Sequence, residues 1–344
     1  MNLQRRIERN PATEPILDYL SRHAARLSAA PKTSDEVMAL ADVIYSRHLL
    51  GLPQEPTEAA ALQSVVKTIR LAGTVGEEKP LLVHLTAYVL GACNLLHAAG
   101  LLDAGEVLRA RKWNFELLFD PKTLLPRWPA HFSHHSWRVS HWVGGAPSIL
   151  RSLWVQSPET CKSLGWPQTA EVLTACDRLV DERTGLLRCY RSDLVQFAFR
   201  QLYRLRHDPA AGDVGGIVHL HWVNYAEGRL PYKAAAELHK RALAVMARTP
   251  FIEATPYCLD FDIVQIVRTT LPGGKADAAL KQRATRYAAD IMAFYKNGLT
   301  ESYGLHRLPG ALATIHECAL INGRSEASEL GIPVVDIMKD AYWI

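Results

Sequence analysis

The sequence predicts an all-α protein of about fourteen helices, because apolar residues recur at helical spacing through most of the chain. Turns rich in Gly, Pro or Asp separate most of these segments, as is expected where neighbouring helices pack antiparallel. No run of alternating apolar and polar residues is long enough to indicate a β-sheet.

The predicted helices can be placed in order along the chain. Ile16 and Leu20 lie on one face of the first helix, and a capping box formed by Thr33 and Glu36 starts the second. Pro80 suits the first position of a long apolar helix. Further helices are predicted at 102–119, 130–142, 146–157, 168–180, 190–205, 214–227, 232–248, 256–271, 275–296, 302–321 and 332–341.

Length and charge limit the class of protein. A chain of 344 residues that is 48% hydrophobic can bury a large core, as two domains or as one closed fold. We expect a single domain over 1–344, with 1–75 as a candidate N-terminal helical extension. The formal net charge of +4 is small and the basic residues are scattered, so nucleic-acid binding is not indicated.

A cytoplasmic location without a membrane span is predicted. The first residues contain no apolar stretch that would suit a secretory signal. The most apolar segment, 81–102, contains His84, Asn94 and His97, which suits a buried helix better than a membrane span. The six cysteines form no C-x-x-C pair and are expected to be free thiols.

A short internal repeat is present. The segment 118–128, LFDPKTLLPRW, resembles 179–189, LVDERTGLLRC, and both carry an Asp and a Thr that can bond the local backbone and close a turn. Repeated helical hairpins are typical of a solenoid or of a toroid closed on itself. The alternative is a chance similarity between two polar turns.

Three motifs resemble the α/α-toroid superfamily: D-E-R-T-G-L-L at 181–187, G-G-I-V-H-L-H-W at 215–222 and C-L-D-F-D at 258–262. That superfamily includes six-hairpin glycosidases, polysaccharide lyases, and the terpenoid-cyclase and prenyltransferase toroids. The resemblance covers roughly residues 115–320 and implies an α/α toroid (barrel) of helical hairpins. Asp260 and Asp262 supply only the first and third positions of the Asp-x-Asp-Asp acid motif of class II terpenoid cyclases.

Asp260 and Asp262 are candidate proton-transfer groups. They fall in the first two turns of a helix that follows Thr255 and Pro256, where the helix dipole favours a carboxylate. Two residues apart on a regular helix, they point about 200° away from each other, so one pocket cannot receive both unless the helix starts late. One of them is expected to be a general acid or base with a raised pKa. The alternative is that Asp260 caps a helix beginning at Phe261 and Asp262 is a first-turn acid.

A second polar helix face lies at 214–227. His221, Asn224 and Tyr225 share one face by their spacing, and His219 and Trp222 share the neighbouring one. Such a face suits sugar hydroxyls or a proton-transfer step, whereas the alternative is a set of hydrogen-bonded core histidines. In a toroid, 214–227 and 256–271 would be adjacent inner helices, which would bring both sets to one internal cavity.

Two further segments supply candidate ligand-binding groups. Histidine and arginine beside tryptophan in 131–142 favour an anionic or sugar-like ligand, although a solvated helix start would look the same. Polar residues in 301–310 can close a cavity or only orient the loop. The predicted catalytic residues are Asp260, Asp262, His221 and Tyr225. The predicted substrate-binding residues are His134, Arg138, His141, Trp142, His219, Trp222, Asn224, Tyr257, Tyr303, His306 and Arg307.

No metal and no cofactor are predicted. His219, His221, Cys258 and Asp260 are ligand types, but the chain has no H-E-x-x-H or C-x-x-C spacing, so only a prenyltransferase-like zinc site is conceivable. Nucleotide-driven chemistry is not indicated, since no glycine-rich phosphate loop or dinucleotide-binding fingerprint is present.

Three functional hypotheses follow. The leading one is an enzyme with a polar central cavity that performs acid–base hydrolysis or elimination on a carbohydrate-like small molecule. The second is an isoprenoid cyclase-like enzyme in which Asp262 protonates an alkene. The third is a non-catalytic helical scaffold that binds a small ligand or a partner protein. Polar walls would favour the first, aromatic walls the second, and a filled centre the third.

Overall fold

The computed structural model describes residues 11, 13–75, 79–128, 136–188, 194–195, 198, 202, 209–230, 234–248, 251–326 and 328–344. These residues form helices and contain no β-strand, which confirms the predicted all-α class. The helix predicted at 190–205 falls almost entirely outside the described residues.

Most predicted helices are present. The longer ones are α2 (Glu14–Ala24), α3 (Ser34–Leu49), α4 (Pro56–Thr68), α5 (Pro80–Ala98), α8 (Ser136–Val143), α9 (Gly145–Gln156), α11 (Thr169–Cys176), α13 (Pro209–Ala226), α14 (Ala235–Met246), α15 (Cys258–Thr269), α16 (Ala278–Gly298) and α17 (Leu308–Ile321). The shorter ones are α6 (Ala104–Arg109), α7 (Phe115–Leu118), α10 (Pro158–Ser163) and α18 (Ile337–Asp340), with 3-10 turns η2 (Asp177–Leu179), η3 (Pro272–Gly274), η4 (Glu301–Tyr303) and η5 (Leu305–Arg307).

Local sequence signals explain several helix boundaries. The predicted capping box forms: the Glu36 N–H donates to Thr33 Oγ1 at 3.2 Å, and the Thr33 N–H donates to the Glu36 carboxylate at 2.9 Å. The single helix predicted at 102–119 is wrong, because Asn114 accepts from the Glu116 N–H at 2.9 Å and starts a separate helix, α7. The helix predicted at 332–341 is reduced to α18.

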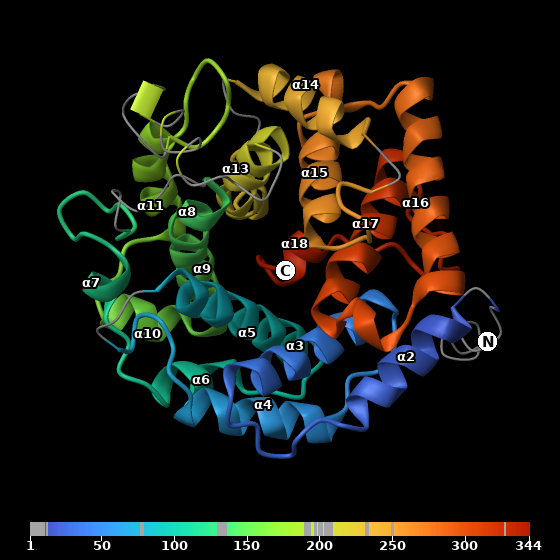
Figure 1. Ribbon diagram of the computed structural model, residues 1–344. Helices are drawn as coiled ribbons and strands as arrows, with labels where there is room; N and C mark the ends of the chain where they lie inside the picture. The colour runs from blue at the N-terminus through green and yellow to red at the C-terminus, as the bar shows by residue number, and fades with distance from the viewer. Residues whose placement is uncertain are drawn as a thin grey trace.

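Seven helices contact one another in an order that follows the chain. α3 contacts α5, α5 contacts α8 and α9, α8 contacts α13, α13 contacts α15, and α15 contacts α17, which in turn contacts α3. Figure 1 shows α2, α4, α14 and α16 at the periphery of this set. The expected adjacency of the helices at 214–227 and 256–271 is therefore confirmed by α13 and α15.

α15 and α17 run in the same direction. Near their starts, Gly310 lies so close to Cys258 that a β-carbon on the glycine would come within 2.5 Å of the Cys258 Cα. Near their ends, Arg268 forms an ion pair with Glu317. Glycine is thus needed where these two helices approach each other most closely.

The chain after α18 lies among these helices. Tyr45 donates its hydroxyl hydrogen bond to the Trp343 carbonyl at 2.6 Å, and Ser148 donates to the Tyr342 carbonyl at 3.0 Å. Trp343 is fully buried, and Tyr342 has a positive φ of 65°. Figure 1 places this end of the chain near the centre of the molecule. The indole of Trp343 therefore becomes part of the interior between α3, α5 and α13.

The two segments of the internal repeat adopt the same turn. The N–H groups of Asp120 and Asp181 each donate to the carbonyl five residues later at 2.9 Å. Each aspartate Oδ1 also accepts the N–H two residues later at 2.8 Å. The turn needs a positive φ at one position, where Leu124 has 57° and Gly185 has 71°. The similarity of the two segments is therefore structural rather than accidental.

One helix in the described part of the chain, Pro80–Ala98, is long and apolar enough to cross a membrane by length and composition. Of its apolar window, 72% is buried inside the protein. The burial of Tyr88, Cys93 and Asn94 on this helix is consistent with the predicted core role.

Candidate functional site

Asp260 caps α15. Its Oδ2 accepts the Tyr257 N–H at 2.8 Å, its Oδ1 accepts the Ile252 N–H at 3.1 Å, and the Tyr287 hydroxyl from α16 also donates to Oδ1. Burial raises the pKa of Asp260 to about 6, although these hydrogen bonds lower it. The carboxyl therefore holds the helix start, but as the third residue of a helix that begins at Cys258, not as the cap of a helix beginning at Phe261.

Asp262 has the opposite environment. The residue is 1% exposed, and neither carboxyl oxygen has a hydrogen-bond partner among the described residues. Its Oδ2 faces Gly215 of α13, where a β-carbon would lie 3.9 Å from Oδ2 and 4.0 Å from the Trp137 ring. Burial raises the pKa of Asp262 well above that of an ordinary aspartic acid, and the nearby Asp260 adds to the rise. Both influences favour the protonated form of Asp262, and neither of its oxygens is hydrogen-bonded within the described structure.

Two other polar side chains lie on the same face of α15. Cys258 is one turn before Asp262, and burial followed by the charges of Asp262 and Asp260 raises the pKa of its thiol. Gln265 is one turn after Asp262 and fully buried, yet neither its amide nitrogen nor its amide oxygen has a partner in the described chain. Buried polar groups are almost always satisfied, so Asp262 and Gln265, which have no partner among the described residues, indicate a place for a ligand or bound water.

Aromatic rings from several elements contact one another. The Trp343 indole stacks on the His219 ring at 4.3 Å between centroids, and its Nε1–H donates to Nδ1 of His84 at 3.1 Å. His141 lies 4.8 Å from His84 and 5.2 Å from His219. The indole of Trp222 crosses that of Trp343 edge-on at 5.6 Å. These rings come from α5, α8, α13 and the chain after α18, which they join in the interior.

The protonation of two of these histidines follows from their partners. Ser140 Oγ donates to the Trp137 carbonyl at 2.5 Å, so it accepts at 2.6 Å from Nδ1 of His219. Burial, followed by the neighbouring histidines, lowers the pKa values of both His219 and His84 well below the ordinary value. Both rings are therefore neutral at physiological pH.

A further polar group joins three elements. Oδ1 of Asp42, on α3, accepts the Tyr88 hydroxyl from α5 at 2.7 Å and Nδ1 of His306, from η5, at 2.9 Å. Asp42 is 2% exposed, whereas 45% of the His306 side chain is accessible. Desolvation is the largest influence on the pKa of His306 and lowers it, but the charge of Asp42 and its hydrogen bond together raise it above the ordinary value.

His306 is partly exposed at the protein surface. Although 45% of its side chain is accessible, the surrounding protein still opposes its charge through desolvation. Its ring lies 5.3 Å from Tyr88 and 5.9 Å from His84. His84 and Cys258 are also partly exposed, and burial disfavours their charged forms. We call the group Asp42, His84, Tyr88, His141, His219, Cys258, Asp262, His306 and Trp343 the central cluster.

His221 and Tyr225 lie elsewhere. Nε2 of His221 is 2.7 Å from the Thr269 hydroxyl, at the end of α15. The Tyr225 hydroxyl bonds Asp336 and accepts from Arg268 at 3.1 Å. The described contacts do not bring His221 and Tyr225 to Asp260 and Asp262, because α13 and α15 run in the same direction and His221 and Tyr225 bond residues near the end of α15.

Several predicted substrate-binding residues hold structure instead. Asn224 bonds the Leu220 carbonyl at 2.9 Å and accepts from Arg229 at 2.7 Å. Tyr303 donates to the Pro256 carbonyl at 2.7 Å. Arg307 bonds Thr255 and lies over the Tyr257 ring at 5.6 Å. Tyr303, Arg307 and Tyr257 therefore orient the loop before α15, which was the alternative for the segment 301–310.

The remaining predicted binding residues have mixed positions. His141, His219 and His306 belong to the central cluster, and Trp222 packs against it. Trp142 is 7% exposed and contributes to the hydrophobic core. Arg138 is exposed, and His134 lies outside the described residues. The sequence did not predict four members of the central cluster: Asp42, His84, Tyr88 and Trp343. The only signal was for His84, because the apolar segment 81–102 contains histidine and asparagine residues.

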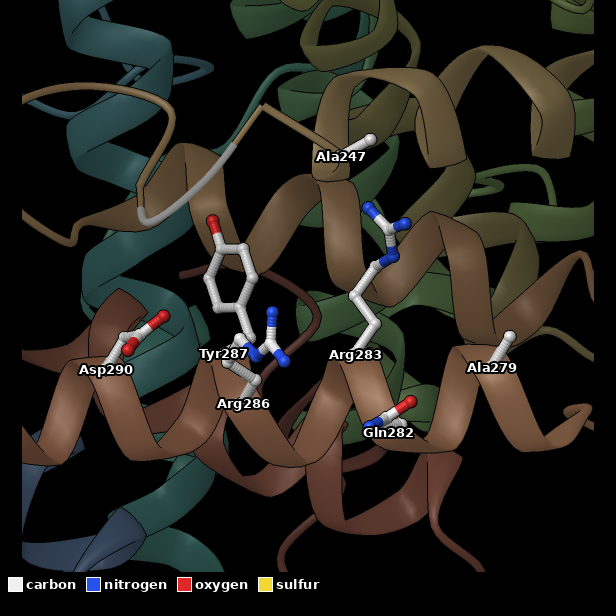
Figure 2. A pocket seen from close by; sticks show the side chains of 7 residues that line it. All are labelled: Ala247, Ala279, Gln282, Arg283, Arg286, Tyr287 and Asp290. Carbon is white, nitrogen blue, oxygen red and sulfur yellow. The ribbon is translucent and has the colours of Figure 1, made fainter.

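A separate pocket of about 330 Å³ lies on the outer surface between α16 and the end of α14. Figure 2 shows Arg283 pointing from α16 toward Ala247, with Tyr287 and Asp290 farther along the helix. None of the predicted site residues lines it. Its single link with the residues discussed above is Tyr287, whose hydroxyl bonds Asp260.

Within the described ranges, no group of three or more His, Cys, Asp or Glu side chains is arranged to hold a metal ion. Comparisons of the chain with protein-family models, with curated proteins and with solved structures give no match. The function of the central cluster is therefore inferred from its residues and their geometry.

Proposed function

We propose that the helices form a closed α/α toroid of the superfamily that the sequence motifs resemble. The order of contacts supports this arrangement, because it passes from α3 through α5, α8 with α9, α13, α15 and α17 and returns to α3. The peripheral position of the intervening α4, α14 and α16 also supports it, since toroid hairpins alternate inner and outer helices (Figure 1).

We propose that the protein is an acid–base enzyme in which Asp262 donates a proton to a carbon–carbon double bond of an apolar, isoprenoid-like substrate. The observation that carries the proposal is the state of Asp262: a buried, neutral acid with both oxygens unpartnered in the described chain. Protonating an alkene requires a carboxyl that keeps its proton and is shielded from water, and a carboxyl without competing acceptors has its proton available for that step.

The surroundings of Asp262 favour an isoprenoid over a sugar. Protonation of an alkene creates a carbocation, and aromatic faces stabilise a cation through their negative quadrupole. Trp137, Trp343 and Tyr88 supply such rings around the cluster. Glycoside hydrolysis needs two carboxyl groups that flank the bond, about 5 to 9.5 Å apart. Asp260 does not supply the second, because it caps α15 and bonds Tyr287.

The carbohydrate hypothesis retains one supporting observation. The unpartnered amide of Gln265 and the unpartnered Nε1–H of Trp222, both fully buried, can hydrogen-bond hydroxyl groups. In the isoprenoid proposal the same groups hold a substrate hydroxyl or an ordered water. The scaffold hypothesis gives no reason for a buried carboxyl without a partner, since replacing it would cost such a protein nothing.

The test uses linear polyprenols in heavy water. The purified protein is incubated in D₂O with farnesol or geranylgeraniol. The products are separated, and their masses are measured by mass spectrometry. We expect deuterium in an isomerised or cyclised product, and its loss in Asp262→Asn. Asp290→Asn, at the outer pocket, is the matched control and should retain the activity. Hydrolysis of a β-glucoside panel that depends on Asp262, without any deuterated polyprenol product, would favour the carbohydrate hypothesis.

A further inference from the structure

We propose that His306, oriented by Asp42 and Tyr88, is the base that removes a proton from the carbocation and so ends the reaction. This inference rests on the proposed function of Asp262. It assigns the removal of a proton from the carbocation to His306. This residue and its partners Asp42 and Tyr88 lie on η5, α3 and α5, whereas the acid lies on α15.

The hydrogen bonds fix which nitrogen of His306 can accept a proton. A carboxylate only accepts, so the bond between Asp42 and Nδ1 at 2.9 Å places the Nδ1 proton on the histidine. Nε2 is then the free, basic nitrogen of the neutral ring. Tyr88 donates to the same Asp42 oxygen at 2.7 Å, which holds the carboxylate in place without competing for Nε2. Imidazolium formation at Nε2 is stabilised by the buried charge of Asp42, as in other acid–base enzymes with a His–Asp pair.

Exposure separates the parts of this group. Asp42 and Tyr88 are almost completely buried, whereas 45% of the His306 side chain is accessible. The imidazole is therefore the accessible part of this group, and the carboxylate and phenol are buried. Gly304, with a φ of 82°, allows the chain to turn between η4 and η5 and to present His306 at the start of α17.

The other titratable groups that face His306 are poorer bases. His84 accepts the Trp343 indole hydrogen bond through Nδ1, and burial lowers its pKa well below the ordinary value. The Tyr88 hydroxyl is committed to Asp42, and burial raises its pKa. His141 lies next to His84 rather than next to His306. Within the described part of the cluster, His306 is thus the accessible ring with a buried carboxylate behind it.

Cys258 is near the segments of both the acid and the base. It is one turn from Asp262 on α15, and a β-carbon on Gly310, four residues after His306, would come within 2.5 Å of its Cα. The charge of Asp262, after burial, raises the pKa of the Cys258 thiol, and the thiol contributes to the raised pKa of Tyr88. A substrate beside Cys258 would therefore be near both groups. Because the acid and the base are separate groups, the proton can be removed from a different carbon than the one that was protonated.

The proposed reaction balances in atoms and electrons. The alkene π pair forms a C–H bond with the proton of Asp262, which leaves a carboxylate and a carbocation. The C–H bond next to the cationic carbon then breaks, its electron pair forms the new double bond, and the proton passes to Nε2 of His306. Return of a proton from His306 through water to Asp262 restores the enzyme, so the product is an isomer of the substrate.

The functional test compares His306→Gln with Asp262→Asn on farnesol and geranylgeraniol in heavy water. Glutamine can keep a hydrogen bond to Asp42 but cannot accept a proton. We expect His306→Gln to lower alkene formation by about a hundredfold and to release deuterated alcohols formed by water capture of the cation. His48→Gln, which alters a surface pair with Asp340 at 3.2 Å, is the matched control and should behave as wild type.

Three outcomes are distinguishable. Wild-type alkene formation in folded His306→Gln, with Asp262→Asn inactive, overturns the assignment of the base and leaves the function of Asp262 intact. Loss of deuterated products of every kind in His306→Gln also overturns it, because the base acts after protonation. If the Asp262→Asn variant keeps full activity, the proposed function itself fails.

A second measurement needs no substrate. The ring Cε1–H signal of His306, assigned by its absence in His306→Gln, is followed by NMR between acidic and alkaline pH. We expect a pKa above the ordinary histidine value in the wild type and a fall in Asp42→Asn, since the neutral amide no longer stabilises the imidazolium. If the pKa of His306 is unchanged in Asp42→Asn, Asp42 does not stabilise the protonated ring. His306 is then an ordinary partly exposed histidine and not the base.

Discussion

The Asp260 carboxyl accepts two backbone N–H groups and the Tyr287 hydroxyl, while the Asp262 carboxyl, on the next turn of the same helix, accepts nothing within the described chain. Both residues are buried, at 0% and 1% exposure. Their opposite directions follow from the helical period, which turns positions two residues apart to opposite faces. One carboxyl therefore holds the helix, and the other is available for chemistry.

Replacing Asp260 is expected to destabilise the protein much more than replacing Asp262. Asp260→Asn presents an amide where two N–H donors need acceptors, and should lower the free energy of unfolding by about 2 kcal/mol or more. Asp262→Asn exchanges a neutral acid for a neutral amide of the same shape, and should change it by less than about 1 kcal/mol. Urea unfolding at pH 5 measures both. A larger loss in Asp262→Asn would mean that its carboxyl has a structural partner.

Stability should fall as pH rises because of Asp262. Its pKa is raised in the folded state, so between the unfolded value of about 3.9 and the folded value the folded protein holds a proton that the unfolded chain has released. The free energy of unfolding therefore decreases with pH across that window, and the stabilisation present below pH 4 or so is progressively lost.

The comparison with Asp262→Asn isolates this effect. The variant lacks the titrating group, so its unfolding free energy should decline less between pH 4 and pH 8 or so than that of the wild type. Asp260, whose pKa is raised to about 6, contributes in the same direction in both proteins and leaves a residual slope. Parallel pH profiles in the two proteins would show that Asp262 is ionised in the folded state.

The sequence was sufficient to predict the helices and part of the site. Periodicity and capping residues predicted α3, α13 and α15 to within a few residues. Asp260 bonds the helix start as the structural alternative held, but α15 begins at Cys258 rather than at Phe261. The role of Asp262 remains a prediction, supported by its burial.

The rest depended on contacts between distant segments. Asp42 and His306 are 264 positions apart, and the Trp343 indole reaches His84 over 259 positions, so no local pattern could pair them. His221 and Tyr225 carried the same residue types as a catalytic site, but helix direction placed them at the other end of α13. Sequence spacing shows which residues share a helix face, whereas depth along the helix requires the packing.

Tyr225 is expected to contribute to stability rather than to proton transfer. Its hydroxyl joins a buried network in which Arg268 also pairs with Glu317 and with Asp336 at 3.2 Å. Tyr225→Phe should lower the free energy of unfolding by about 1 kcal/mol and leave deuterium incorporation unchanged. Arg268→Met should cost about 3 to 5 kcal/mol, because it leaves the buried Glu317 without its partner. Loss of activity in well-folded Tyr225→Phe would restore the catalytic role predicted from the sequence.

The two copies of the repeated turn should respond differently to substitution. Gly185 has a φ of 71°, and an added β-carbon would lie 2.9 Å from Leu238 Cβ and 3.2 Å from the Ala234 carbonyl. Gly185→Ala should therefore cost about 1 to 2 kcal/mol for the left-handed backbone and more for the contact with α14. Gly165→Ala is the matched control, since its φ is 66° and nothing lies within 4 Å of the added carbon.

At the equivalent position of the other copy, Leu124 already has a φ of 57°. Leu124→Gly relieves this backbone strain but loses packing, so the free energy of unfolding should stay within about 1 kcal/mol of wild type. Urea unfolding of the three variants gives the comparison, and equal losses in Gly185→Ala and Gly165→Ala would show that α14 does not press on this turn.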